Sequence, residues 1–188
     1  MRSLLLSAES ACMRSELARL LEAIDFAAEK HRNQRRKDHE ASPYINHPLG
    51  LAALLAKVGG VNDVEVLQAA VLHDTIEDTN TTYEELQVRF GKRVADIVAE
   101  VTDDKNLPKQ VRKQLQIERA PHKTAEASLV KLADKTCNLR DIATAPPADW
   151  SLERRREYFE WAKQVVDRLP KVNEKLLDAF HEAYSMRP

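Results

Sequence analysis

The sequence predicts a single all-α domain of eight to ten helices. Two observations favour this fold class. Only 4 of the 188 residues are glycines, and a β-rich fold needs more of them for its tight turns. Apolar residues recur at three- and four-residue steps along most of the chain, which is the spacing of one helix face. The chain is also of a length that suits one domain.

Composition and charge exclude several classes of protein. The chain is 43% hydrophobic and 31% charged, which is typical of neither a disordered nor a membrane-spanning chain. A net charge of -1 gives no overall attraction to nucleic acid or to anionic lipid, so we expect neither as a partner. Two cysteines are too few for a disulfide framework, and no secretory signal is apparent, so we expect a cytoplasmic location.

The first two predicted helices flank a basic loop. Residues 1–13 are expected to form a poorly ordered extension, and residues 14–188 the domain. The first helix spans about residues 14–32 and is followed by a polar, strongly basic stretch. Pro48 suits the first turn of the second helix, and the glycine pair at 59 and 60 suits its end.

The third predicted helix covers about residues 63–78. Asn62 is its expected N-cap, with Glu65 three residues later completing a capping box. Its first ten residues are apolar nearly all round. A helix without a polar face is buried, so we expect this one at the centre of the domain.

The remaining helices are bounded by similar signals. Thr82 with Glu85 forms a second capping box, Ser151 is an expected N-cap, and Pro170 is expected to open the last helix. The expected ranges are about 83–90, 92–101, 108–119, 125–143, 151–169 and 170–184.

An unusual group of ionisable side chains ends the central helix. Its members are His73, Asp74, Glu77 and Asp78. At about 100° per residue they share an arc of roughly 140°. Burying such groups without partners is costly, and carboxylates are disfavoured at the negative end of a helix dipole. The helix therefore either ends in solvent or places these groups around a cation, and the dipole argument favours the cation.

Two other segments offer ligands for the same ion. His47 begins the second helix, and Asp134 interrupts an otherwise apolar helical stretch. Together with His73 and Asp74 they supply two imidazoles and two carboxylates. This mixed set suits an octahedral Mn²⁺ or Fe²⁺ with open positions, more than a structural zinc.

The order of these residues resembles the HD superfamily of metal-dependent phosphohydrolases. The longer pattern resembles the hydrolase domain of the RelA/SpoT alarmone enzymes, especially the small stand-alone members found in metazoans. The resemblance covers about residues 17–170. It is carried by Arg35-Arg36-Lys37, Pro43-Tyr44-Ile45-Asn46-His47-Pro48, His73-Asp74-Thr75-Ile76-Glu77-Asp78, Leu132-Ala133-Asp134-Lys135 and Asn138-Leu139-Arg140.

The resemblance implies hydrolysis of guanosine-3′,5′-bis(diphosphate), or ppGpp, to GDP and pyrophosphate with Mn²⁺. It also implies no synthesis, because the chain ends at Pro188 without room for the synthetase domain of the long enzymes. Two alternatives stay open. One is a phosphatase acting on another 2′- or 3′-phosphorylated nucleotide such as NADPH, and the other is a non-catalytic nucleotide sensor. In each, the partner is a small-molecule nucleotide; nothing in the sequence sets an oligomeric state.

The resemblance also implies roles for individual residues. Glu77 and Asp78 are the expected catalytic pair, which orients and deprotonates the attacking water or assists the leaving group. The expected substrate-binding residues are Arg36, Lys37, Asn138, Lys109 and Tyr158.

The residues themselves give partial support to these roles. A nearly neutral protein needs a local basic patch to hold a polyanion, and Arg36 with Lys37 provides one. Asn138 follows Asp134 by four residues, so both face the same way on a helix. The competing interpretation of both features is a solvated loop and a solvated helix face. His31, a histidine without a ligand-like setting, is expected to be a surface or packing residue.

Overall fold

The computed structural model describes the backbone of residues 2–188 and the side chains from residue 16 onward. This part of the chain contains ten α-helices, one 3-10 helix and no β-strand, which confirms the all-α fold. The helices are α1 (Arg2–Lys30), α2 (Asn46–Lys57), α3 (Val64–Leu72), α4 (Thr75–Asp78), α5 (Tyr83–Phe90), α6 (Lys92–Val101), α7 (Lys109–Arg119), η1 (Ala120–His122), α8 (Ala125–Thr144), α9 (Leu152–Val166) and α10 (Glu174–Ser185).

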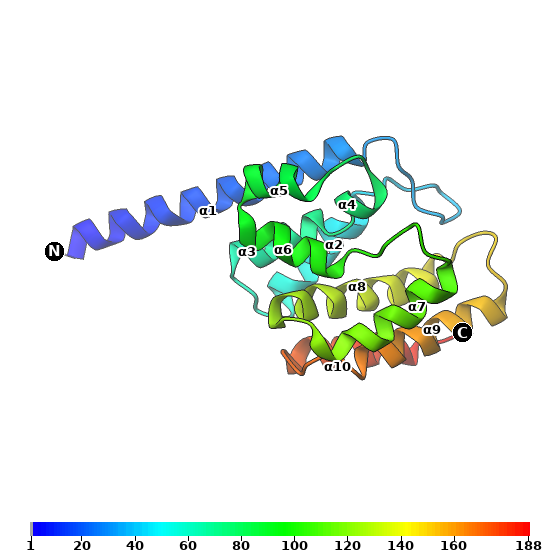
Figure 1. Cartoon of the computed structure of the whole chain (residues 1–188). Coiled ribbons are helices and arrows are strands. Elements are labelled where there is room, and N and C mark those ends of the chain that lie inside the picture. The colour runs from blue at the N-terminus through cyan, green and yellow to red at the C-terminus, as the bar shows by residue number, and fades with distance from the viewer. Residues whose placement is uncertain (1) are drawn as a thin grey trace.

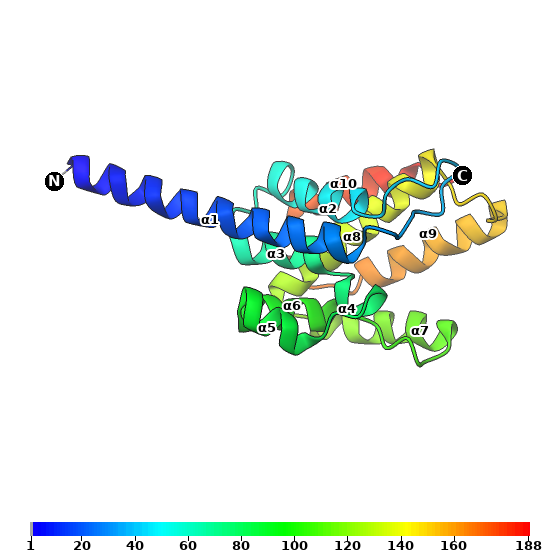
Figure 2. The same cartoon turned by 90° about the horizontal axis from the view of Figure 1, so that it is seen from above.

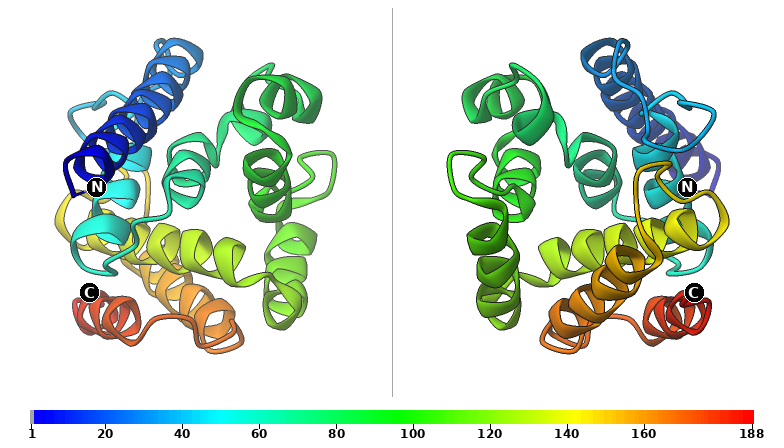
Figure 3. Two further views of the ribbon diagram at one scale, coloured as in Figure 1. Left: turned by 90° about the vertical axis from the view of Figure 1, so that its left-hand side faces the viewer. Right: turned by 90° about the vertical axis from the view of Figure 1, so that its right-hand side faces the viewer.

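Helices α3 and α8 organise the molecule. Helix α3 contacts α1, α2 and α6, and α8 contacts α2, α6, α9 and α10. Figure 1 shows α9 and α10 on the side of α8 that faces away from α1. The N-terminal half of α1 extends beyond the other helices in both perpendicular views (Figures 1 and 2). Seen along α1, the other helices surround α3 and α8 (Figure 3).

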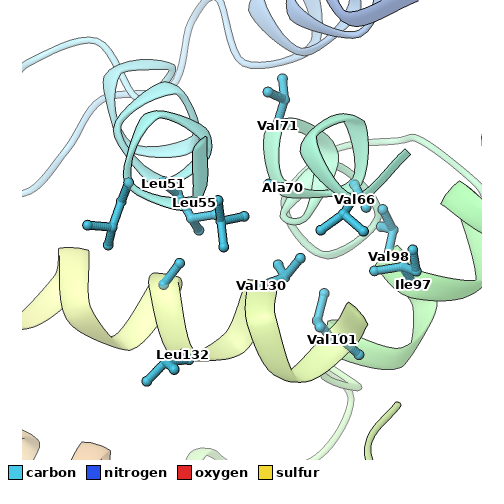
Figure 4. Close-up of a cluster of buried hydrophobic side chains, with 14 of the residues drawn as sticks. Leu51, Leu55, Val66, Ala70, Val71, Ile97, Val98, Val101, Val130 and Leu132 are labelled. Atoms are coloured by element: carbon cyan, nitrogen blue, oxygen red, sulfur yellow. The ribbon is translucent and has the colours of Figure 1, made fainter. Parts of the chain in front are cut away.

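The core lies between α2, α3, α6 and α8. The last four residues of α3, from Ala69 to Leu72, are all fully buried, which confirms that this helix is central. Figure 4 shows Leu55 of α2 and Val130 of α8 pointing into the space between the helices, with Val98 of α6 on the far side of α3. Each large apolar side chain buried here contributes about 1.5–3 kcal/mol to folding.

The predicted helix over residues 63–78 differs from the observed structure at its start and in its middle. Its N-cap is Asp63 rather than Asn62, because the Asp63 carboxylate accepts the N–H of Glu65 at 2.9 Å. The helix is also broken, with α3 ending at Leu72 and α4 beginning at Thr75. The Thr75 hydroxyl donates to the Leu72 carbonyl at 2.7 Å, and such local bonds compete with the helical ladder.

The last helix begins four residues later than predicted, at Glu174 rather than Pro170. Asn173 explains the shift because its carboxamide oxygen accepts the N–H of Leu176 at 3.0 Å, while its nitrogen donates to the Gly59 carbonyl at 2.8 Å. This contact ties the start of α10 to the chain that follows α2. A side chain at Gly59 would come within 2.7 Å of the Leu55 carbonyl oxygen, so the junction needs glycine.

Two further expectations concern the chain as a whole. Poor order of the extension over residues 1–13 stays a prediction, because its side chains lie outside the described residues. Among the helices that the structure describes, none combines the length and the apolar character needed to cross a membrane.

Candidate metal centre and active site

A cavity of about 610 Å³ brings together every predicted site residue except Arg36. Arg36 lines an adjoining cavity of about 600 Å³. The two cavities share part of their walls. Their common lining residues are Lys37, Tyr44, His47, Asp78, Asn138, Trp150 and Tyr158. The fold therefore gathers into one region residues that are more than a hundred positions apart.

Three predicted metal ligands form a compact buried group at the centre of this region. His47, His73 and Asp134 each offer one ligand atom, and these atoms lie within 4.8 Å of one another. The Asp134 Oδ1 atom is 3.3 Å from His47 Nε2 and 4.0 Å from His73 Nε2. The group forms because α2 packs on both α3 and α8, which carry these residues.

The orientation of the His73 imidazole fits a metal ligand. Its Nδ1 atom lies 2.9 Å from the Ala70 carbonyl oxygen, and only an Nδ1–H can donate there. The neutral ring therefore presents the Nε2 lone pair to the acidic group. Nε2 is 2.9 Å from the Asp74 Oδ2 atom, so two lone pairs face each other unless a proton or a cation lies between them. The Asp74 carboxylate raises the pKa of His73 in spite of burial.

The carboxylates beside these imidazoles are held in their ionised form, in which they can bind a cation. Burial alone would raise the pKa of Asp134, but Lys135 and His47 hold it well below its usual range. The pKa of Asp74 is likewise lowered, because His73 offsets the effect of burial. The Tyr44 hydroxyl donates to Asp74 Oδ2, and burial together with Asp74 raises the pKa of Tyr44. Two carboxylates and two imidazoles suit a divalent cation.

Glu77 lies one helical turn beyond His73, on α4. Its Oε2 atom accepts the backbone N–H of Asp103 at 3.2 Å, and its Oε1 atom is 3.6 Å from Arg112 Nη1. Burial and the nearby Asp74 carboxylate raise the pKa of Glu77. This side chain can therefore hold a proton more readily than an exposed glutamate.

Asp78 lines both cavities and is held from two sides. Its Oδ2 atom accepts a hydrogen bond from Gln34 Nε2 at 2.7 Å, and its Oδ1 atom pairs with the Lys105 ammonium. The sequence argument missed Gln34, Lys105 and the Glu77 partner Arg112. These residues are distant from α4 in the sequence and share no periodic pattern with it. Their contacts with Asp78 and Glu77 are therefore visible only in the tertiary structure.

Arg36 and Lys37 lie at the junction of the two cavities. The Arg36 guanidinium pairs with Asp141 and lies 5.8 Å from the centroid of the Tyr44 ring. Lys37 is exposed and lines both cavities. The predicted basic patch thus adjoins the predicted metal ligands.

A second cationic group, on α7 and α9, lines the first of these cavities. It consists of Lys109, Lys113 and Arg154. Burial, followed by the charges of Arg154 and Lys37, lowers the pKa of Lys109. Sequence reasoning found only Lys109. The four-residue spacing of Lys109 and Lys113 on α7 was an available signal, because it places both on one helix face.

Asn138 and Tyr158 line both cavities. Asn138 Nδ2 donates to Asp134 Oδ1 at 2.6 Å, so the two residues face the same way on α8 as predicted. The Tyr158 ring packs between Trp150 and Trp161, at centroid distances of 5.6 and 5.1 Å. The result is an aromatic surface next to the acidic centre.

The fold and this site define a class of protein, a helical domain in which imidazoles and carboxylates from separate helices are placed to hold a divalent metal ion. Residues 23–160 match the family model of the HD domain. This chain belongs to the HD domain family.

Relatives of known name cover nearly the whole chain. The guanosine-3′,5′-bis(diphosphate) 3′-pyrophosphohydrolase MESH1 of Homo sapiens is 56% identical over 93% of this chain and 98% of its own length. The Xenopus tropicalis protein of the same name is 59% identical over 86% of this chain and 90% of its own length. These matches confirm the family resemblance.

A solved structure shares the fold. It is described as a metazoan ortholog of SpoT that hydrolyses ppGpp and plays a role in starvation responses. Its TM-score is 0.88 at 46% sequence identity, over 90% of this chain and 96% of that one.

Proposed function

We propose that this protein hydrolyses ppGpp to GDP and pyrophosphate with Mn²⁺. The observation that carries the proposal is one cavity that holds a buried His-His-Asp group, a pair of adjacent carboxylates and converging cations. The names of relatives that are 56% and 59% identical give the substrate.

His47, His73, Asp74 and Asp134 would hold the Mn²⁺ ion. The Nδ1–H bond of His73 to the Ala70 carbonyl supports this assignment, because it directs the Nε2 lone pair at the carboxylates. When bound, the ion supplies a water of lowered pKa and polarises a phosphoryl oxygen.

Glu77 and Asp78 would carry the proton transfers. The raised pKa of Glu77 suits a residue that gives a proton to the leaving group. Asp78, held by Gln34 and Lys105, would orient the attacking water and accept its proton. Adjacent carboxylates in different surroundings can thus serve as acid and base.

The substrate has an anionic group at each end, and the cavity has two cationic groups. Arg36 and Lys37 would bind one end, and Lys109 of α7 would bind the other. Charge-assisted contacts of this kind bind phosphate strongly. Tyr158 would contact the nucleoside, and Asn138 would pair with the guanine edge. We also place the protein in the cytoplasm, which fits the free thiol of Cys137.

The proposal is tested by incubating the full chain with Mn²⁺ and ppGpp and measuring GDP and pyrophosphate. A parallel reaction with NADPH measures release of orthophosphate. The expected result is one pyrophosphate per GDP, with no product from a sample stripped of metal. Turnover of NADPH without turnover of ppGpp would instead establish a nucleotide phosphatase. If no nucleotide is turned over in the presence of Mn²⁺, the remaining interpretation is a non-catalytic nucleotide sensor.

A further inference from the structure

We propose that His31 is a positioning residue, which fixes the side chain of Gln34 and through it the carboxylate of Asp78. The inference rests on the role proposed above for Asp78. His31 follows the last residue of α1 and is only 2% exposed. It does not line either cavity of the site, so it would act through its neighbours.

A continuous chain of hydrogen bonds connects His31 to Asp78. The His31 Nδ1 atom is 2.6 Å from Gln34 Oε1, and Gln34 Nε2 is 2.7 Å from Asp78 Oδ2. The three residues come from the end of α1, from the basic loop and from α4. Their contact spans 44 positions of sequence, which is why no local pattern predicted it.

The chemistry of the groups sets the direction of this chain. An ionised carboxylate only accepts hydrogen bonds, so the amide nitrogen of Gln34 must face Asp78. The amide oxygen then faces His31, and the hydrogen must reside on His31 Nδ1. The His31 Nε2 atom is buried and has no hydrogen-bond partner in the described part of the chain. The imidazole therefore has one polar function here, donation to Gln34.

This connection is the more rigid of the two that hold Asp78. Lys105, which pairs with the other carboxylate oxygen, has a side chain that is 49% exposed. A long exposed side chain holds its partner loosely, because it gives up conformational freedom to do so. Gln34 is also long, but its amide is fixed at both ends by His31 and Asp78.

The His31 ring has a second contact that an experiment can separate from the first. Its centroid is 4.9 Å from that of the Tyr44 ring, and the Tyr44 hydroxyl donates to Asp74. Replacement by phenylalanine keeps an aromatic ring against Tyr44 and removes the donor. Replacement by asparagine removes the ring and keeps a donor close to the position of Nδ1.

The test measures turnover of ppGpp by the full chain with saturating Mn²⁺. His31→Phe and Gln34→Leu should each lower kcat by about tenfold, as expected for loss of one orienting hydrogen bond. KM should change by less than about twofold in His31→Phe, because His31 lines neither cavity. His31→Asn should keep kcat within about threefold of the wild-type value. Substitution of the exposed His122 by phenylalanine is the matched control.

The double variant with His31→Phe and Gln34→Leu distinguishes positioning from general damage. Residues that act in one chain are not additive, so its kcat should equal that of Gln34→Leu alone. Three results would overturn the inference. The first is a double variant whose loss of kcat is the product of the two single losses. The others are equal losses of kcat in His31→Phe and His31→Asn, and a wild-type kcat in His31→Phe. Failure of the proposed function is distinguishable, because it would already show as absence of ppGpp turnover in the wild-type chain.

Discussion

The imidazole of His73 shows how a single backbone contact determines chemistry at the residue scale. The Ala70 carbonyl oxygen accepts a hydrogen bond from His73 Nδ1–H. The other ring nitrogen, Nε2, therefore carries a lone pair that can bind a metal ion. Asp74 then faces that nitrogen at 2.9 Å, in an arrangement that needs positive charge between the two atoms. The same neighbourhood lowers the pKa of Asp74 and of Asp134. Each contact makes the others more favourable once a cation is present.

The first prediction concerns the Asp74 ligand. Asp74→Ala should abolish both metal binding and turnover, because it removes the carboxylate that faces His73 Nε2. Metal analysis of the purified variant, with parallel assay of ppGpp hydrolysis, measures both. Asp96→Ala, at an exposed residue paired with Lys92, is the control and should keep its metal. Stoichiometric Mn²⁺ in the Asp74→Ala protein would show that Asp74 is not a ligand.

The second prediction concerns the carboxylates of α4. Glu77→Ala and Asp78→Ala should each keep the metal and most of the nucleotide affinity. Turnover should fall by roughly 10²–10⁴-fold, the usual scale of acid–base catalysis. Metal analysis and single-turnover kinetics separate these effects. Loss of metal from either variant would make that residue a ligand.

At the scale of helices, the sequence predicted the number and order of the elements better than their ends. Apolar periodicity located every long helix because burial of one face is a local property of the chain. The break at His73 and Asp74 was not predictable, since a Thr75 hydroxyl bond competes with the helix there. The start of α10 depends on Asn173, whose partner Gly59 lies 114 positions away.

The same distinction applies to the site. His47, His73, Asp74 and Asp134 stand out in the sequence because ionisable groups interrupt apolar helices. Their supporting residues carry no such signal. Gln34 and Arg112 are ordinary polar residues of loops and exposed helices until the fold brings them to α4.

The third prediction tests the junction between α6 and η1. Lys123 follows η1, and its Nζ atom donates to the Glu100 carbonyl oxygen at 2.5 Å. Burial, followed by the charge of Lys131, lowers the pKa of Lys123 from 10.5 to about 8. Between these pH values the unfolded chain binds more protons at this residue than the folded one. The contribution of this residue to the free energy of unfolding should therefore rise with pH across that interval.

Comparison with Lys123→Met isolates this contribution from those of other lysines. Thermal melting of the wild type and the variant is measured at pH values from below 8 to near 10.5, the interval set by the two pKa values. The Tm of the wild type minus that of the variant should increase as the pH rises. A difference that stays constant with pH would mean that the pKa of Lys123 is the same in the folded and the unfolded protein.

At the scale of the whole molecule, charge is balanced overall and concentrated locally. The 29 basic residues nearly equal the 30 acidic ones, so long-range attraction of an anion is weak. The cavity, however, is lined by several carboxylates and by several cationic side chains. A polyanion that binds in the cavity needs positive charge close to those carboxylates.

The last prediction tests whether Arg36 and Lys37 supply that charge. The acidic centre repels phosphate, and one divalent ion does not offset Asp74, Asp134 and the two carboxylates of α4. Each charge-assisted contact is worth roughly 1.5–3 kcal/mol, so Arg36→Ala should lower kcat/KM by roughly 10- to 100-fold while the metal stays bound. Arg36 already pairs with Asp141, whereas Lys37 is exposed. The contribution of Lys37 to kcat/KM should therefore be weakened by added salt at least as much as that of Arg36.

Steady-state kinetics of ppGpp hydrolysis over a range of salt concentrations measures both effects. Wild-type kcat/KM should fall as salt rises, because screening weakens the attraction between the basic patch and the nucleotide. The Arg36→Ala and Lys37→Ala proteins should show a shallower dependence, since part of that attraction is already gone. Arg168→Ala, at an exposed position outside both cavities, is the control for a lost surface charge. Wild-type efficiency in both patch variants would mean that the patch is a solvated loop and that the nucleotide enters the cavity from the side of α7 and α9.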